Sequence, residues 1–378
     1  MRPALVIKGG DCLQTESDDA KKLHPSLEYL IKKQSFIVPI IAVIVALIIG
    51  SVLIYFQGAN PIGAYKTILQ ASLGNERGLI RTLEKTTPLI LAGLAVAVAL
   101  RVGLFNIGAQ GQLIMGAFFA TWAGFTFTNL PALIHIFVGL LAGIIAGGLW
   151  AAIAGILKAY RGVHEVISTI MLNSIAIAIL DYLVNYPYKE PDQPLPRTVP
   201  ILESAQLPKI GFVPVGFILA LLVATFISWL INRTTTGFRF NTVGANKFAA
   251  AYAGIKIKYV VVSSMLLSGG LAGLGGAIET LGITYRFEPA FNKGLGFDGI
   301  TIALLARANP IATIPAAFLV GILRSGAPTL QFDYGLEPEI VDLLLALTLL
   351  FVAAPILGKL IFRKRAEKSE NVSSGWGS

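Results

Sequence analysis

Charged residues and cysteine are both scarce in this chain of 378 residues. Only 13% of its residues are charged, whereas a soluble domain averages about a quarter. The one cysteine, Cys12, cannot form a disulfide bond within the chain, so cysteine usage indicates no redox compartment. The three histidines stand apart from one another and from Cys12, and no H-E-x-x-H motif occurs. These absences argue against a metal site and against a metal-dependent enzyme.

Signatures of nucleotide-binding and secreted proteins are also missing. There is no G-x-x-x-x-G-K-[ST] loop, so the chain does not bind ATP in the Walker manner. Roughly 35 mostly polar residues precede the first apolar run, and no A-x-A site follows it, so a cleaved signal peptide is not expected. Residues 1–35 are instead predicted to be a cytoplasmic N-terminal segment.

Long apolar runs are what the sequence has in abundance. Hydrophobic residues make up 55% of the chain and gather in runs of about 18–25, the length that crosses a hydrocarbon core of about 30 Å. The alternating segments of about ten residues that mark a β-barrel are not found. We therefore expect an all-α polytopic membrane protein whose transmembrane domain covers residues 36–362. About ten crossings are predicted, at 36–56, 87–104, 107–126, 132–157, 166–185, 213–232, 259–281, 296–308, 311–328 and 339–362.

The basic residues behind the net charge of +9 are spread unevenly between the two predicted sides of the membrane. With the N-terminus inside, the inner loops and tails carry twenty lysines and arginines, and the outer loops carry ten. The positive-inside bias then places both termini, including a tail over 363–378, in the cytoplasm. Because this distribution accounts for the basic balance, membrane lipid is the expected surrounding and nucleic acid is not an expected partner.

Several parts of the chain depart from plain membrane helices. The segment 296–308 covers only about 20 Å as a helix, too little to span alone, and Asn309-Pro310 follows it. Such a short, broken segment is tolerated where it is buried in protein or lines a cavity. Two polar stretches, 57–86 and 186–212, are expected as outer loops. The second is rich in proline, and either a plain connector or a contact for an external partner fits it.

Uncharged polar residues mark a candidate path for a solute. Asn106, Gln110 and Gln112 interrupt an otherwise apolar stretch, and Thr169 and Asn173 are four residues apart, so they share one helix face. Amides both donate and accept hydrogen bonds, which suits a neutral polar solute. Hydrogen bonding between helices is the alternative explanation of the same residues.

The acidic residues argue mildly against an ion-coupled carrier. Asp181, Glu279, Asp298 and Asp342 lie near the predicted outer ends of their segments, and none lies clearly at the midplane. Proton-driven and sodium-driven carriers usually place acidic residues deep in the membrane.

One predicted inner loop, 233–258, carries the start and stop signals of a short helix. Asn246 is suited to cap its N-terminus, about two turns follow, and Gly254 can end them in a left-handed conformation. Phe248 and Tyr252 are four apart and face the same way. A capped helix with an aromatic face suits docking into a partner's groove, and a helix lying on the lipid surface is the alternative.

At this loop the sequence resembles the permeases of ABC importers for branched-chain amino acids, sugars and nucleosides. Their coupling helix lies in a loop of the form G-x-N-x-x-A-A-x-Y-x-G-I, matched here by Gly244, Asn246, Ala249, Ala250, Tyr252, Gly254 and Ile255. The stretches FNIGAQGQLIMGA, HEVISTIMLN and GFDGITIALLARANP are also similar to stretches of these permeases, and the last two resemble the nucleoside branch. The resemblance covers about residues 36–362.

The resemblance implies a permease subunit in the cytoplasmic membrane of a prokaryote that passes a nucleoside, without a catalytic residue, metal or cofactor of its own. It implies three partners: a cytoplasmic ABC ATPase, a second homologous permease forming a heterodimer, and an extracytoplasmic substrate-binding lipoprotein. The matched loop, with Phe248, would contact the ATPase. A sugar or an amino acid is the alternative solute. An ion-coupled secondary transporter and a non-transporting membrane scaffold are alternatives of other classes.

Overall fold

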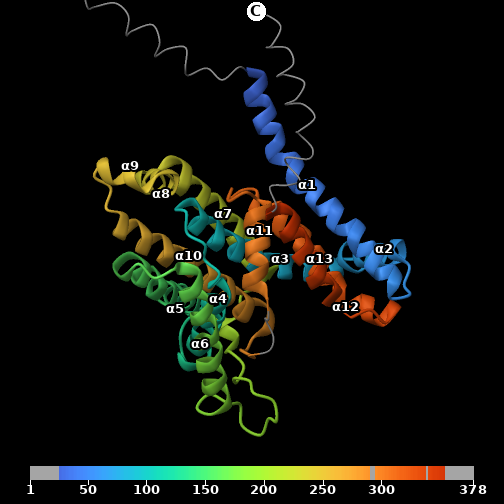
Figure 1. Cartoon of the computed structure of the whole chain (residues 1–378). Coiled ribbons are helices and arrows are strands. Elements are labelled where there is room, and N and C mark those ends of the chain that lie inside the picture. Colours follow the sequence, from blue (N-terminus) through green and yellow to red (C-terminus); the bar gives the residue numbers. More distant parts are fainter. Residues whose placement is uncertain (1–24, 290–293, 338, 354–378) are drawn as a thin grey trace, which may run out of the picture. The chain divides into compact units, whose positions relative to one another are not determined.

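The computed structural model describes residues 25–289, 294–337 and 339–353, and over these residues the chain is largely helical (Figure 1). The chain divides into two compact units, residues 1–44 with 355–378 and residues 45–354. The larger unit holds the elements on which the candidate sites depend. Of the predicted N-terminal segment, the part from Pro25 is described as the beginning of helix α1 (Pro25–Phe56). The predicted tail over 363–378 lies outside the described residues.

Thirteen α-helices follow one another in the described part of the chain, with one pair of very short antiparallel strands. A π-helical turn, η3 (Thr280–Thr284), continues α10, and a 3-10 turn, η2 (Glu203–Ala205), precedes the strands. The remaining elements are α2 (Pro61–Leu73), α3 (Glu76–Arg101), α4 (Ala109–Thr126), α5 (Ala132–Arg161), α6 (Glu165–Asn185), β1 (Lys209–Ile210), β2 (Val213–Pro214), α7 (Val215–Arg233), α8 (Thr235–Ala245), α9 (Lys247–Tyr252), α10 (Ile257–Glu279), α11 (Leu295–Leu305), α12 (Thr313–Tyr334) and α13 (Glu339–Ala353).

Seven helices in the described chain are long and apolar enough to cross a membrane: α1, α3, α5, α6, α7, α10 with its π-helical turn, and α12. This confirms the expected all-α polytopic membrane fold. The three other predicted segments coincide with α4, α11 and α13, which are shorter or less apolar. The count of ten crossings and the orientation of the chain stay predictions.

Helices α3 and α10 form the centre of the larger unit. Within their apolar spans 83% and 78% of the residues are buried, compared with 28% to 33% in α5, α6 and α7. Glycines bring α10 close to its neighbours, because a Cβ at Gly273 would collide with the Gly143 carbonyl of α5. A Cβ at Gly276 would likewise collide with the Leu113 carbonyl of α4. Small residues therefore set the backbone distances around the central helices.

The stretch 57–86, expected as a polar loop, is largely helical, and its side of the membrane stays a prediction. This stretch contains α2 and the first turns of α3. Asn60 caps α2 by accepting a hydrogen bond from the Ile62 amide at 3.0 Å, and Pro61 follows at the first helical position. Asn75 caps α3 through the Gly78 amide at 2.7 Å. Hydropathy missed α2, which has only 13 residues, and the charged first turns of α3, although the capping residues of both are visible in the sequence.

The short segment predicted at 296–308 is the helix α11, whose eleven residues cover about 17 Å. Arg307 and Ala308 just after it have left-handed backbone conformations, with φ of +52° and +53°. The helix is buried along α3, where a Cβ at Gly299 would lie 2.7 Å from the carbonyl carbon of Ala92. A short helix thus lies inside the protein, as its length requires.

A buried ion pair holds the start of α11. The Arg324 guanidinium of α12 donates twice to the Asp298 carboxylate, at 2.8 Å each, and lies 2.5 Å from Asp342 of α13. The Asp298 side chain is 8% exposed. Three helices therefore meet at one arginine, in the bidentate geometry that makes arginine–carboxylate pairs strong.

Candidate functional site

The predicted polar residues converge where α3 ends and α4 begins. After α3 the chain turns at Gly103, whose φ of +75° suits glycine, and an irregular segment leads to Gly108 at the start of α4. Asn106 lies in this segment, and Gln110 and Gln112 lie in the first turn of α4. The break in the helix therefore places three amides within a few residues of one another at the centre of the bundle.

Asn106 and Gln112 form a reciprocal pair of amides. Asn106 Nδ2 donates to Gln112 Oε1 at 2.8 Å, and Gln112 Nε2 donates back to Asn106 Oδ1 at 3.0 Å. Asn106 Nδ2 also donates to Ser268 Oγ of α10 at 2.8 Å. Ser268 in turn donates to the Ala95 carbonyl of α3 at 2.6 Å. Ser268 is not among the predicted polar residues, because nothing in its glycine-rich stretch distinguishes a hydrogen-bonded serine from one that only packs.

Gln110 and Asn173 attach α4 to two further helices. The Gly296 amide at the start of α11 donates to Gln110 Oε1 at 2.8 Å. Asn173 of α6 accepts from the Gly111 amide at 2.8 Å and donates to the Ile107 carbonyl at 3.0 Å. A Cβ at Gly111 would lie 2.7 Å from Asn173 Oδ1, and one at Gly296 would collide with the Gln110 backbone. Glycine is needed at both donors for the helices to come this close.

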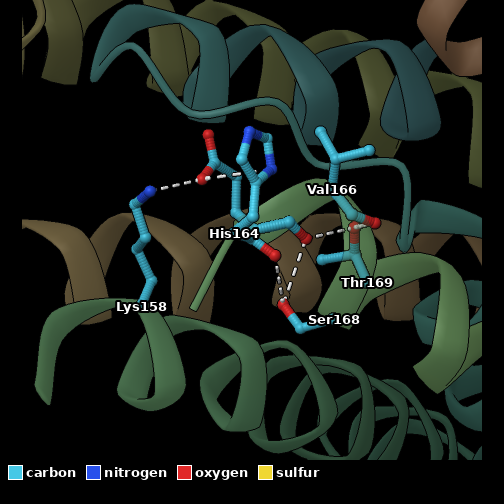
Figure 2. A network of polar contacts seen from close by, with 6 residues as sticks. Lys158, His164, Val166, Ser168 and Thr169 are labelled. Carbon is cyan, nitrogen blue, oxygen red and sulfur yellow. Dashed lines mark hydrogen bonds and ion pairs between the residues drawn. The ribbon is translucent and has the colours of Figure 1, made fainter. Parts of the chain in front are cut away.

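Thr169 lies in the first turn of α6, which Figure 2 shows from close by. Its hydroxyl donates within the helix to the Glu165 carbonyl at 2.7 Å. Ser168 Oγ donates to the carbonyls of His164 and Glu165, at 3.4 Å and 3.1 Å. Lys158 Nζ of α5 lies 2.7 Å from Glu165 Oε2, an ion pair that ties α5 to α6 (Figure 2). Both hydroxyl donors are therefore used within α6.

The five predicted polar residues thus form one buried cluster, and none of them is more than 5% exposed. The hydrogen bonds of Asn106, Gln110, Gln112 and Asn173, together with that of Ser268 to Ala95, join α3, α4, α6, α10 and α11, whereas Thr169 hydrogen bonds only within α6. Such satisfied buried networks rigidify the elements that they connect. Contact with a solute requires a conformation in which some of these bonds are exchanged, so the role of the cluster in a solute path stays a prediction. The described residues hold no group of three or more His, Cys, Asp or Glu side chains placed to bind a metal.

The predicted capped helix is present as α9, beside α8 (Figure 1). The Asn246 side chain accepts from the amides of Phe248 and Ala249, at 2.9 Å and 3.1 Å. Gly254 adopts the expected left-handed conformation with φ of +78°. The helix ends at Tyr252, and the Ile255 amide closes the turn by donating to the Ala250 carbonyl at 3.0 Å. The local structure of this segment is confirmed as predicted.

The two faces of α9 differ in exposure. Phe248 is 81% exposed and Tyr252 is 95% exposed, so both aromatic rings project from the chain. Ala249 is exposed beside them, whereas Ala250 is completely buried against the core of the chain. Large exposed aromatic side chains on one face indicate an interaction surface. Ala250 lies outside that surface in this structure, so its expected contact with a partner stays untested while its role in internal packing is evident.

The segment around α9 contacts the end of α3 directly. A Cβ at Gly244, the second-last residue of α8, would collide with the Arg101 carbonyl. Gly103 also lies close to Gly244, because a Cβ added at Gly103 would be 3.7 Å from the Gly244 backbone. Arg101 Nε donates to the Ala308 carbonyl after α11 at 2.9 Å. The end of α3, directly before the segment that carries Asn106, therefore contacts both α8 and the chain after α11.

A family model described as the permease component of branched-chain amino acid transport systems matches residues 78–353. The guanosine ABC transporter permease protein NupP of Bacillus subtilis is 38% identical to this chain, with 90% of this chain and 100% of the relative covered. The nucleoside ABC transporter permease protein NupB of Lactococcus lactis is 33% identical, with coverage of 88% and 94%. The glucose ABC transporter permease protein TsgB13 of Haloferax volcanii is 34% identical, with coverage of 83% and 86%. Bacillus subtilis and Lactococcus lactis each have a second, less similar relative: the guanosine permease protein NupQ, 28% identical, and the nucleoside permease protein NupC, 27% identical.

Proposed function

Because this chain belongs to the permease family of branched-chain amino acid transport systems, we propose that it is the membrane-spanning permease subunit of an ABC importer for nucleosides. The observation that carries this proposal is the 38% identity to a guanosine permease over that relative's whole length. The chain passes the solute and performs no covalent chemistry. ATP hydrolysis takes place on a separate ATPase chain.

We propose that the ATPase docks on the exposed face of α9. Phe248 and Tyr252 offer a large, unburied aromatic surface beside one another on a helix with defined ends. Such anchors gain binding free energy when a partner's groove removes them from water. The other proposed partners are a second, homologous permease and an extracytoplasmic substrate-binding lipoprotein. The pair of relatives in each of two bacteria supports the paired permease.

Movement of α9 has a short physical route to the buried polar cluster. Docking displaces α9 together with α8, and Gly244 at the end of α8 bears on the Arg101 carbonyl. Arg101 leads through Gly103 into the segment that holds Asn106. A shift of this segment exchanges the hydrogen bonds of the cluster and opens the path on the other side, as alternating access requires. Asn106, Gln110, Gln112, Thr169 and Asn173 then face the solute in at least one state of the cycle.

The alternative solute within the same family is a sugar, which the 34% identity to a glucose permease favours. The test is uptake of labelled guanosine and uridine by the assembled importer, with unlabelled nucleosides, glucose and leucine as competitors. Competition by nucleosides alone supports the proposal. No uptake of labelled nucleosides, with uptake of labelled glucose by the same assembled importer, replaces the nucleoside by a sugar. Uptake that persists without the ATPase and follows a proton or sodium gradient would overturn the importer itself.

A further inference from the structure

Two hollows lie along α5 and α10, and one of them is basic. The basic hollow has a volume of about 820 Å³ and lies between the end of α5 and the elbow that joins α9 to α10. Its lining includes Lys256 and Lys258, the rings of Tyr160 and Tyr259, and the apolar side chain of Ile156. No acidic residue lines it. The surface therefore presents positive charge at one end and apolar side chains at the other.

The second hollow, of about 350 Å³, is apolar throughout. It lies between α5, α7 and α10, and its lining includes Leu149, Phe226, Leu266 and Gly270. None of its lining residues is polar or charged. The exposed side chains beside it, such as Leu149 at 60% and Phe226 at 53%, are those of helices that face lipid.

Helical spacing places the two hollows one after the other on the same faces of α5 and α10, and this surface is called the groove below. Along α10 the lining residues at positions 259, 262, 266, 270 and 274 recur every three or four residues, so they share one face. Along α5 the positions 145, 149, 156 and 160 are four or seven residues apart, so they also share one face. From Lys258 to Gly270 there are twelve helical residues, or about 18 Å. This is close to half of a hydrocarbon core of about 30 Å, so the apolar hollow lies near the midplane when the lysines lie at the interface.

The basic end is built to receive an anion. Lys258 Nζ lies 5.0 Å from the centre of the Tyr160 ring, so its ammonium group is held over an exposed aromatic side chain. An adjoining hollow of about 490 Å³ shares Lys256 and Tyr259 and adds Arg239. Three cations therefore surround the elbow before α10, and no acidic residue lines either hollow.

We propose that this groove binds one anionic phospholipid. The phosphate of the headgroup lies among Lys256, Lys258 and Arg239, and one acyl chain follows α5 and α10 to the apolar hollow beside Phe226. The inference rests on the proposed membrane function and extends it to a lipid site that adjoins α9, because Ala251 and Gly254 line the basic hollow as well. Charge complementarity favours an anionic lipid over a zwitterionic one, and the apolar continuation favours a lipid over a free phosphate ester.

The test uses the full-length chain, purified in mild detergent and supplied with phosphatidylglycerol or phosphatidylcholine of equal acyl length. Native mass spectrometry then measures the lipid that each sample retains. Wild type is expected to retain phosphatidylglycerol in preference to phosphatidylcholine. Lys256→Gln and Lys258→Gln are each expected to weaken phosphatidylglycerol retention about fivefold, the effect of one basic residue at a membrane surface. Lys189→Gln, which removes an exposed charge from the loop 186–212, is the matched control and is expected to change nothing.

The apolar end has its own pair of variants. Gly270→Leu fills the hollow and is expected to reduce retention, whereas Gly270→Ala leaves it open, because a Cβ there lies 3.4 Å from its nearest neighbour. Equal retention of both lipids by wild type, or wild-type retention by both lysine variants, would overturn the proposal. Displacement by soluble glycerol phosphate, with no effect of Gly270→Leu, would identify a phosphate-ester site instead. Loss of ATPase binding in the lysine variants with unchanged lipid retention would assign the basic hollow to the ATPase. Lipid retention is measured without solute or ATP, so its outcome is independent of the uptake experiment.

Discussion

Truncating the exposed aromatic residues of α9 separates docking from folding. Phe248 and Tyr252 are 81% and 95% exposed, so Phe248→Ala and Tyr252→Ala remove almost no buried surface from the isolated chain. The free energy of unfolding should therefore stay within about 0.5 kcal/mol of wild type. An aromatic anchor buried by a partner contributes about 2 kcal/mol or more, so each truncation should weaken ATPase binding about thirtyfold.

Ala250 provides the opposite case in the same helix. It is completely buried against the core of its own chain, so Ala250→Trp must displace neighbouring groups, at a cost of about 1–3 kcal/mol of stability. Ala250→Trp should lower the unfolding temperature of the permease. It should weaken ATPase binding only if it also displaces α9. Phe248→Ala and Tyr252→Ala should instead keep the wild-type unfolding temperature and bind the ATPase more weakly.

The measurements are co-purification of the ATPase, solute-stimulated ATP hydrolysis, and thermal unfolding of the permease in detergent. Phe238→Ala is the matched control, because Phe238 is a 66% exposed aromatic residue on α8. Wild-type ATPase binding by both Phe248→Ala and Tyr252→Ala would refute the docking role of α9. A loss of binding in Phe238→Ala of the same size would widen the docking surface to α8.

Four further predictions follow from the same structure. Gly244→Ala places a Cβ against the Arg101 carbonyl, so transport should fall while ATPase binding persists, and normal uptake would exclude this contact as a route of coupling. Asn106→Leu removes both hydrogen bonds of the buried Gln112 amide and the donor to Ser268 Oγ, so it should lower stability by about 1–3 kcal/mol as well as transport, and a stable, active variant would show that the cluster is dispensable. Asp298→Ala removes the bidentate partner of Arg324, which keeps Asp342, so it should cost about 1–3 kcal/mol of stability in thermal unfolding, whereas the double change with Arg324→Met should recover most of it. Single cysteines introduced into α9 and into the proline-rich loop, after removal of the native cysteine, should label from outside only in the loop, and the reverse pattern would invert the predicted orientation.

Much of the fold could be predicted because its signals are local. The apolar runs predicted the membrane helices, and the structure contains a helix at each of the predicted positions. Asn246 and Gly254 predicted the bounds of α9, because a cap acts on amides two or three residues away. Hydropathy does not detect α2 or the start of α3, although Asn60 and Asn75 are local capping signals of the same kind.

The sequence by itself determined the class of the protein and the residues capable of polar contacts in its membrane domain, because both follow from composition and from spacing along one chain. Only the tertiary structure decided how those residues are used. Asn106 meets Ser268 across 162 positions, and Gln110 meets Gly296 across 186, so neither partner leaves a trace near the other in the sequence. The sequence does not distinguish Ala250 from its neighbour Ala249, but in the fold Ala250 is buried and Ala249 is exposed. Burial and pairing of this kind depend on helices packed side by side, a property that no short stretch of sequence contains.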